Sequence, residues 1–249
     1  MRIQGSSVSV KYNKIDGIKK IYYNNESVLK DYFNEATILP VPDDAPVEIP
    51  RIIIKTLNEH AQLNISLTAA TFDVQYDCGF EYNWRNCAEY IKARMEKVLE
   101  FLNLLTNNHY EYIGIVTNII YDEIPQDGEK QLSSILLHTE EIDEVFDVNI
   151  RYSFVEENRF FTNIQLQNAR VFKTGVSKDI AGGLNEKNQE LNSIGAIIDI
   201  NDRYGFNCFN DYNSDSTVLD DLLEKMGNVI ENKLQLLIEE GIYHNGNQE

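Results

Sequence analysis

Oxygen-bearing side chains alternate just before the last predicted helix, in the order Asp211, Asn213 and Asp215. Ligand oxygens at steps of two resemble the first half of a calcium-binding loop. The pattern then fails, because Ser216 replaces the turn glycine and Leu222 stands where a bidentate glutamate would close the site. A helix cap would explain the same residues equally well. The sequence therefore offers one incomplete calcium candidate at this loop.

Histidine spacing gives no metal site of the usual kind. No H-x-x-x-H or H-E-x-x-H pair exists that would place two imidazoles on one ion. The histidines are His60, His109, His138 and His244.

The cysteines are odd in number and show no C-x-x-C spacing; they are Cys78, Cys87 and Cys208. Buried thiols in a reducing cytoplasm are the simplest interpretation. Cys87 lies on the apolar stripe of a predicted helix, which indicates a core residue. Cys78 or Cys208 could still meet a histidine in space as a nucleophile pair.

Carboxylates close two predicted strands: Asp199 and Asp202 at one, Asp122 and Glu123 at another. Converging pairs could act as general acid and base or hold Mg²⁺. Because the chain has 40 acidic residues, chance pairs are common, and a structural role is favoured. No G-x-G-x-x-G or G-x-x-x-x-G-K-[ST] phosphate loop occurs. We therefore name no catalytic residue, cofactor-binding residue or cofactor.

The net charge of the 249-residue chain is −18, with −6 in residues 1–138 and −12 in residues 139–249. The electric field of such a negative charge repels the phosphate backbone of nucleic acids, so direct nucleic-acid binding is not expected. Two interpretations remain: an ordinary acidic protein, or a surface that imitates DNA or recruits a basic partner.

Apolar stretches are short throughout the sequence. No run approaches the roughly 20 residues of a membrane-spanning helix, and the first ten residues alternate like a strand rather than forming a signal peptide. We expect a cytoplasmic protein with no membrane association.

Hydrophobic periodicity predicts alternating strands and helices. The expected fold is α+β, largely antiparallel, with two long amphipathic helices on one face of the sheet. Predicted strands are Ile3–Tyr12 (with Lys20–Tyr23 as a continuation), Arg51–Leu57, Ala61–Tyr76 with a bulge near Ala70, Tyr112–Tyr121, Val145–Val155, Arg159–Phe172 and Ile194–Ile200. Predicted helices are Asn25–Ala36, Asn83–Leu105, Glu129–Leu137 and Val218–Glu240.

The order of these elements repeats approximately along the chain. We expect one compact unit over residues 1–249 with structural halves 1–108 and 109–249, which join their sheets. An uncovered face of such a sheet would suit binding or dimerisation. Residues 173–190, with three glycines, are predicted to be a functional flap or a disordered crossing.

Four of the five prolines lie in residues 40–50, where Asp44-Ala-Pro-Val-Glu-Ile-Pro-Arg51 precedes a strand. Proline donates no hydrogen bond, so this segment must be an extended connector. The D-A-P-x-E-I-P-R segment, with Ile198–Asp202 before the last long helix, resembles a sporadically distributed family of bacterial proteins of unknown function. The resemblance implies a bacterial protein, carried on defence-related or mobile loci, and supplies no catalytic residues.

These observations predict a non-enzymatic interaction or scaffold protein that binds another protein or itself as a homo-oligomer. Two alternatives stay open: an enzyme, such as a carboxylate-based hydrolase whose site assembles from distant residues, and an acidic DNA-mimic decoy.

Overall fold

The computed structural model describes residues 1–42, 44–77, 79–122, 124, 127–136, 145–172 and 189–244. Its strands are β1 (Arg2–Lys11), β2 (Thr37–Ile38), β3 (Ile52–Lys55), β4 (Ala61–Ile65), β5 (Ala69–Gln75), β6 (Tyr112–Tyr121), β7 (Asn149–Glu156), β8 (Phe160–Phe172) and β9 (Gln189–Asn201). Its helices are α1 (Ile18–Asn25), the short 3₁₀ turn η1 (Glu26–Val28), α2 (Trp84–Thr106), α3 (Gly128–Leu136), α4 (Arg203–Cys208), α5 (Val218–Asn228), the π-helix η4 (Val229–Lys233) and α6 (Leu234–Glu240). The predicted α+β class is confirmed.

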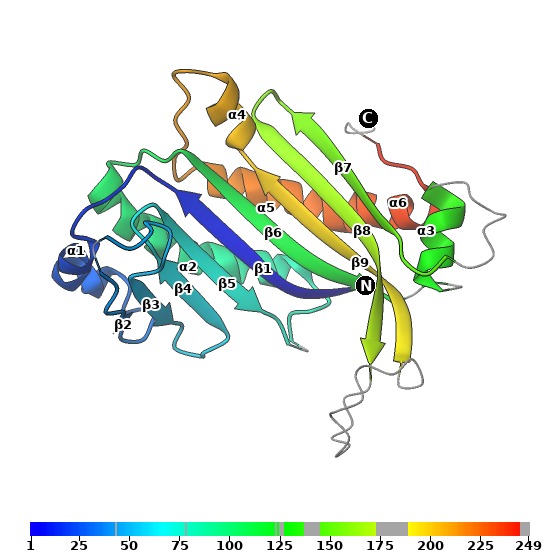
Figure 1. Cartoon of the computed structure of the whole chain (residues 1–249), viewed down its shortest axis with the longest axis horizontal. Helices are drawn as coiled ribbons and strands as arrows, with labels where there is room; N and C mark the ends of the chain where they lie inside the picture. The colour runs from blue at the N-terminus through cyan, green and yellow to red at the C-terminus, as the bar shows by residue number, and fades with distance from the viewer. Residues whose placement is uncertain are drawn as a thin grey trace, which may run out of the picture.

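The strands form one antiparallel sheet in the order β2-β3-β4-β5-β1-β6-β9-β8-β7 (Figure 1). β1 and β6 pair at the centre, with Val8 opposite Ile115 and Val10 opposite Ile113. On one side of this pair follow β5, β4 and β3, and on the other follow β9, β8 and β7. The sheet therefore runs without a break from the first half of the chain into the second.

The two halves follow the same order of elements. Each has a central strand, a helix, three antiparallel strands that return toward the centre, and a final long helix. The first half adds the short edge strand β2, which pairs with β3. Because the central strands are antiparallel, the halves are arranged about an approximate two-fold axis between β1 and β6.

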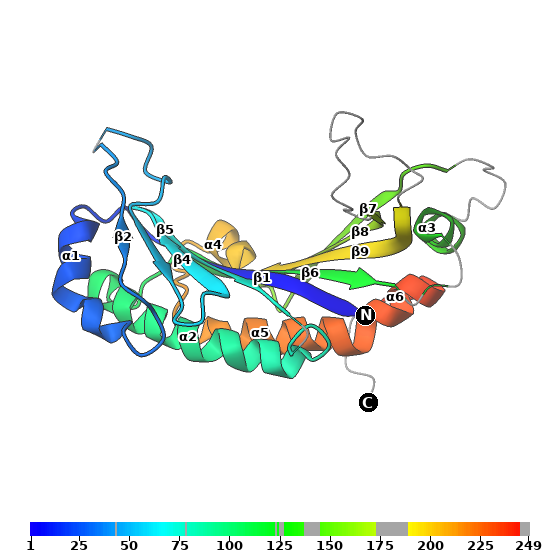
Figure 2. The same ribbon diagram turned by 90° about the horizontal axis from the view of Figure 1, so that it is seen from below.

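Both long helices lie on the same face of the sheet (Figure 2). Along β1, Val8 and Val10 are fully buried against them, whereas Ser7 and Ser9 on the other face are partly exposed. This period of two is the pattern of a sheet with one covered face. The side chains of the covered face and the helices make up the hydrophobic core.

α2 is close to its predicted extent. The side chain of Asn83 accepts a hydrogen bond from the backbone N–H of Asn86 and caps the first turn, as predicted. Asn107, in the left-handed conformation, ends the helix. Its predicted apolar stripe is buried at all positions except Leu105, namely Trp84, Cys87, Ile91, Met95, Val98 and Leu102.

The proline-rich connector is not extended throughout, contrary to expectation, but makes two turns, in which Ala45 N–H donates to the carbonyl of Pro42 and Ile49 N–H to that of Pro46. It folds around Arg51, which is only 2% exposed. Its guanidinium donates hydrogen bonds to the carbonyls of Ala45, Pro46 and Ile49, the shortest being 2.6 Å to Ile49. Prolines leave carbonyl acceptors without supplying N–H donors, and the five donors of arginine compensate for them. The D-A-P-x-E-I-P-R segment therefore has a structural explanation.

Four sequence-based expectations differ from the structure or lie partly outside its described residues. The predicted helix Asn25–Ala36 contains only the 3₁₀ turn η1, because the helix of this region, α1, comes earlier and ends at Asn25. Residues 61–76 are two strands, β4 and β5, because the Ser66 hydroxyl accepts hydrogen bonds from the N–H groups of Thr68 and Ala69 and closes a turn without glycine or proline. Lys20–Tyr23 lies in α1, not in a strand, because Gly17 begins a helix there. Residues 173–188 of the predicted loop lie outside the described residues, and Gln189 begins β9.

The two long helices approach each other where Trp84 of α2 meets Gly227 of α5. A Cβ atom at position 227 would lie 2.9 Å from both Cδ1 and Nε1 of the indole. The indole N–H donates a 3.3 Å hydrogen bond to the carbonyl of Leu223. Glycine is therefore required at this position for the ring to reach the helix backbone.

We predict that Gly227→Ala lowers the free energy of unfolding by about 1 kcal/mol net. Overpacking costs about 1–3 kcal/mol, and alanine regains only about 1 kcal/mol over glycine in a helix. Urea unfolding followed by circular dichroism measures the change. Glu224→Ala at an exposed position of the same helix serves as the control and should be nearly neutral. A Gly227→Ala variant more stable than the wild type would contradict the close contact.

Candidate functional site

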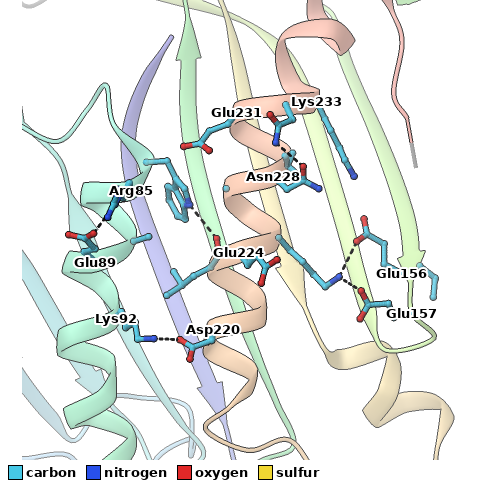
Figure 3. Close-up of a pocket in the computed structure, with 18 residues that line it drawn as sticks. Arg85, Glu89, Lys92, Glu156, Glu157, Asp220, Glu224, Asn228, Glu231 and Lys233 are labelled. Atoms are coloured by element: carbon cyan, nitrogen blue, oxygen red, sulfur yellow. Dashed lines mark hydrogen bonds and ion pairs between the residues drawn. The ribbon is translucent and has the colours of Figure 1, made fainter. Parts of the chain in front are cut away.

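A broad groove of about 1140 Å³ crosses the outer side of the long helices (Figure 3). One wall is α2, the middle is α5 with η4, and the other wall is the turn between β7 and β8. The apolar floor consists of Trp84, Ala88, Leu223 and Val229. The groove is lined by six acidic and four basic side chains: Glu89, Glu156, Glu157, Asp220, Glu224 and Glu231, and Arg85, Lys92, Lys225 and Lys233.

The α2 wall of the groove is held by ion pairs at its surface. Arg85 contacts Glu89 one turn later at 3.0 Å. Lys92 crosses to Asp220 of α5 at 2.7 Å, and the hydrogen bond from this pair raises the pKa of Lys92. These side chains are 45–83% exposed, and exposed pairs contribute only about 0–1 kcal/mol each.

Lys225 holds the opposite wall in place. Its ammonium lies 3.5 Å from Glu156 and 2.6 Å from Glu157, and 4.9 Å from the centre of the Phe160 ring. Glu157 and Asn158 both have positive φ, as a two-residue hairpin turn requires. Lys225 thus ties the hairpin turn to α5.

Two acids of the groove, Glu224 and Glu231, are exposed and make no ion pair with any residue that the structure describes. Four cations face six carboxylates in the lining, and three of those cations are already paired with its acids. Lys233 lies over the Tyr243 ring, 5.1 Å from its centre. The lining of the groove therefore carries more carboxylates than cations, and its charge would suit a positive partner.

The helix is irregular where it lines the groove. Residues 229–233 form a π-helix between α5 and α6, in which each backbone hydrogen bond spans one more residue than in an α-helix. Such insertions occur frequently at functional sites. Here Val229 is buried and forms part of the floor, while Glu231 and Asn232 are exposed along the groove.

The uncovered face of the sheet carries two carboxylates that hold equivalent positions in the two halves. Asp73 of β5 accepts hydrogen bonds from Ser7 at 2.7 Å and from Asn64 at 3.1 Å. Asp199 of β9 accepts hydrogen bonds from Asn163 at 3.2 Å and from Asn201 at 2.8 Å. In both halves, an asparagine of the next strand outward donates to the aspartate.

The distance between Asp73 and Asp199 follows from the register of the strands that separate them. Asp73 lies opposite Ser7, Ser7 opposite Val116, and Val116 opposite Asp199. Three interstrand steps place the two carboxylates about 14 Å apart. They are too distant to share a proton or a metal ion.

Asp202, the predicted partner of Asp199, is fully buried. It accepts hydrogen bonds from the N–H of Ile113 at 2.7 Å, from the hydroxyl of Ser214 at 2.6 Å and from Tyr212. Burial raises the pKa of Asp202, while these hydrogen bonds and the charge of Arg159 oppose the rise. The structure therefore separates Asp199 and Asp202, because one points to the uncovered face and the other into a hydrogen-bonded core network.

The residues of the incomplete calcium candidate have other partners. The amide oxygen of Asn213 accepts a 2.8 Å hydrogen bond from His109 Nδ1, and its amide nitrogen donates to the carbonyl of Asn108. Asp215 accepts hydrogen bonds from the N–H and hydroxyl of Thr217 at 2.8 and 2.6 Å, just before α5. Asp211 is exposed. No group of three His, Cys, Asp or Glu side chains in the described ranges is arranged to hold a metal ion.

Within the described residues, no hydrogen bond joins a cysteine to a histidine. Cys87 is buried, and burial raises its pKa to about 12, so this thiol stays neutral. Cys208 is exposed at the end of α4. His60 lies 3.9 Å from Asp77. Cys78, Glu123 and His138 lie outside the part of the chain that the structure describes.

Sequence reasoning missed the groove, because its acids come from two helices and a hairpin that are far apart in the chain. The available signal was local: Asp220, Glu224 and Glu231 recur on the polar side of the last helix. Only the tertiary packing of α2 beside α5 turns that side into a wall.

Comparison with known proteins finds no matching family model and no matching curated protein. The resemblance to a sporadic bacterial family therefore stays a prediction. No helix within the described residues is both long and apolar enough to span a membrane.

We predict that Asp202→Ala lowers the free energy of unfolding by about 3 kcal/mol or more, because it removes the acceptor of three donors, of which those of Ile113 and Ser214 belong to buried residues. Asp199→Ala is the matched control on the same strand end and should cost less than about 1 kcal/mol. Urea unfolding of both variants measures the difference. Equal stability of Asp202→Ala and wild type would show that the network is not structural and would reopen a functional role for this carboxylate.

Proposed function

We propose that this chain is a non-enzymatic interaction protein whose groove binds a basic segment of a partner protein. The observation that carries the proposal is the pair of unpaired acids, Glu224 and Glu231, in a lining with more acids than bases. Complementary charge steers association and selects the partner.

The concentration of charge in the groove supports a binding role. Surface ion pairs add little to stability, so folding alone does not explain ten charged side chains around one groove. The net charge of −18 extends the same attraction beyond the groove.

The shape of the groove also favours a polypeptide segment. Three separate elements contribute walls, and the charged groups are spread along them rather than gathered around one reacting atom. The floor offers Ala88 to small apolar contacts, with Trp84 only 5% exposed beside it, and Val155 at the hairpin is 45% exposed. A segment that alternates lysine or arginine with small apolar residues fits this arrangement.

A designed peptide of alternating lysine and alanine tests the proposal, with a glutamate–alanine peptide as the opposite-charge comparison. We predict that the lysine peptide binds and changes the fluorescence of Trp84, the single tryptophan of the chain, and that the glutamate peptide does not. Glu224→Lys/Glu231→Lys should weaken binding at least about tenfold, because two attractive contacts become repulsive.

The matched control is Glu35→Lys/Glu48→Lys, which gives the same net charge through two exposed acids outside the groove lining. If both double variants lose affinity equally, the attraction is a property of the whole chain and the groove is not the site. Light scattering of the wild type and the groove variant identifies the case in which the partner is a second copy.

A further inference from the structure

A second, smaller pocket of about 170 Å³ lies at the corner between the end of β5 and α2. It is separate from the groove, because the two share no lining residue. Its walls include three aromatic rings, Tyr76, Phe80 and Tyr90, with the side chain of Val74. Asp77 and His60 stand at its mouth, and their side chains are 58% and 54% exposed.

The three rings form a continuous aromatic wall. Phe80 is nearly parallel to Tyr76 at 6.4 Å between ring centres and meets Tyr90 edge-on at 5.7 Å. The hydroxyl of Tyr76 is buried beside Ser6 and Cys87, and burial raises its pKa far above the ordinary value. The ring is therefore held as a neutral phenol, with its polar end turned into the protein.

The ring of Tyr90 already makes one cation–π contact within the protein. The guanidinium of Arg94, which does not line the pocket, lies 3.4 Å from the centre of this ring. The hydroxyl of Tyr90 donates a 3.1 Å hydrogen bond to Asn58 and so fixes the ring. Attraction of a cation to such rings is worth about 0.5–2 kcal/mol, depending on how fully it is desolvated.

The carboxylate of Asp77 at the mouth gives the pocket a negative charge. Asp77 accepts a hydrogen bond from the N–H of Gly79 at 3.3 Å and makes no ion pair with a lysine or arginine of the described residues. Aromatic faces and a carboxylate disfavour anions, and an apolar wall penalises strongly hydrated ammonium groups. A weakly hydrated organic cation meets both conditions.

We propose that this pocket binds a quaternary methylammonium group, carried either by a small molecule or by a trimethylated lysine side chain. Three aromatic walls, an aliphatic side chain and one carboxylate at the mouth are the combination that recognises such groups. The negative charge of the whole chain raises the local concentration of cations.

Titration of the full chain with choline, followed by calorimetry and by the ring-proton NMR signals of the pocket, tests the proposal. The comparison ligand is the carbon analogue of choline, in which a tert-butyl group replaces trimethylammonium without changing the shape. We expect choline to bind at least about fivefold more tightly than this neutral analogue. Acetylated trimethyl-lysine, titrated in parallel, decides between the two sources of the group.

Phe80→Leu keeps an apolar side chain but removes the ring, and should weaken choline binding about fivefold. Phe209→Leu, at an aromatic residue 50% exposed outside the pocket, is the matched control. Asp77→Asn, at an exposed position, keeps the test valid if Phe80→Leu fails to fold. Equal affinity for choline and its carbon analogue, unchanged affinity in these variants, or no saturable signal at millimolar choline would each overturn the proposal.

Discussion

The antiparallel pairing of β1 with β6 is the interaction on which the rest of the structure depends. It places the two halves about an approximate two-fold axis, and each half sends its final helix back across the same face. A sheet with alternating apolar and polar side chains must bury only one face, and α2 and α5 together cover that face. The groove follows from this arrangement, because the two helices lie side by side only when the central strands pair.

Close approach of the helices then depends on one small residue. Gly227 admits the indole of Trp84 to the backbone of α5, and this contact sets how near the charged outer sides of the helices come. Lys92 of α2 makes its ion pair with Asp220 of α5 across the same gap between the two helices. The buried contact between α2 and α5 therefore determines how the charged side chains on the outer sides of these helices are arranged. The proposed binding of a basic segment depends on this contact and on these charges.

Much of the fold was predictable from local pattern, and most of the candidate site was not. The alternation in Ile3–Tyr12 and the Asn83 cap with its apolar stripe identified β1 and α2, because period and capping act within a few residues. The turn at Ser66 was missed because a hydroxyl replaces the usual glycine or proline. Asp199 and Asp202 are three residues apart, yet their surroundings differ because the sheet buries one and leaves the other uncovered. Only long-range packing decides such differences.

The π-helix at residues 229–233 has a consequence for how the chain tolerates changes of length. A π-turn is in effect an α-helix that has absorbed one additional residue. Removing a single residue there would let α5 and α6 close into one regular helix, whereas the same deletion inside α2 would rotate the part of its apolar stripe beyond the deletion by about 100° relative to the rest. Natural or engineered shortening of this protein is therefore accommodated more readily in the last helix than in the first long one.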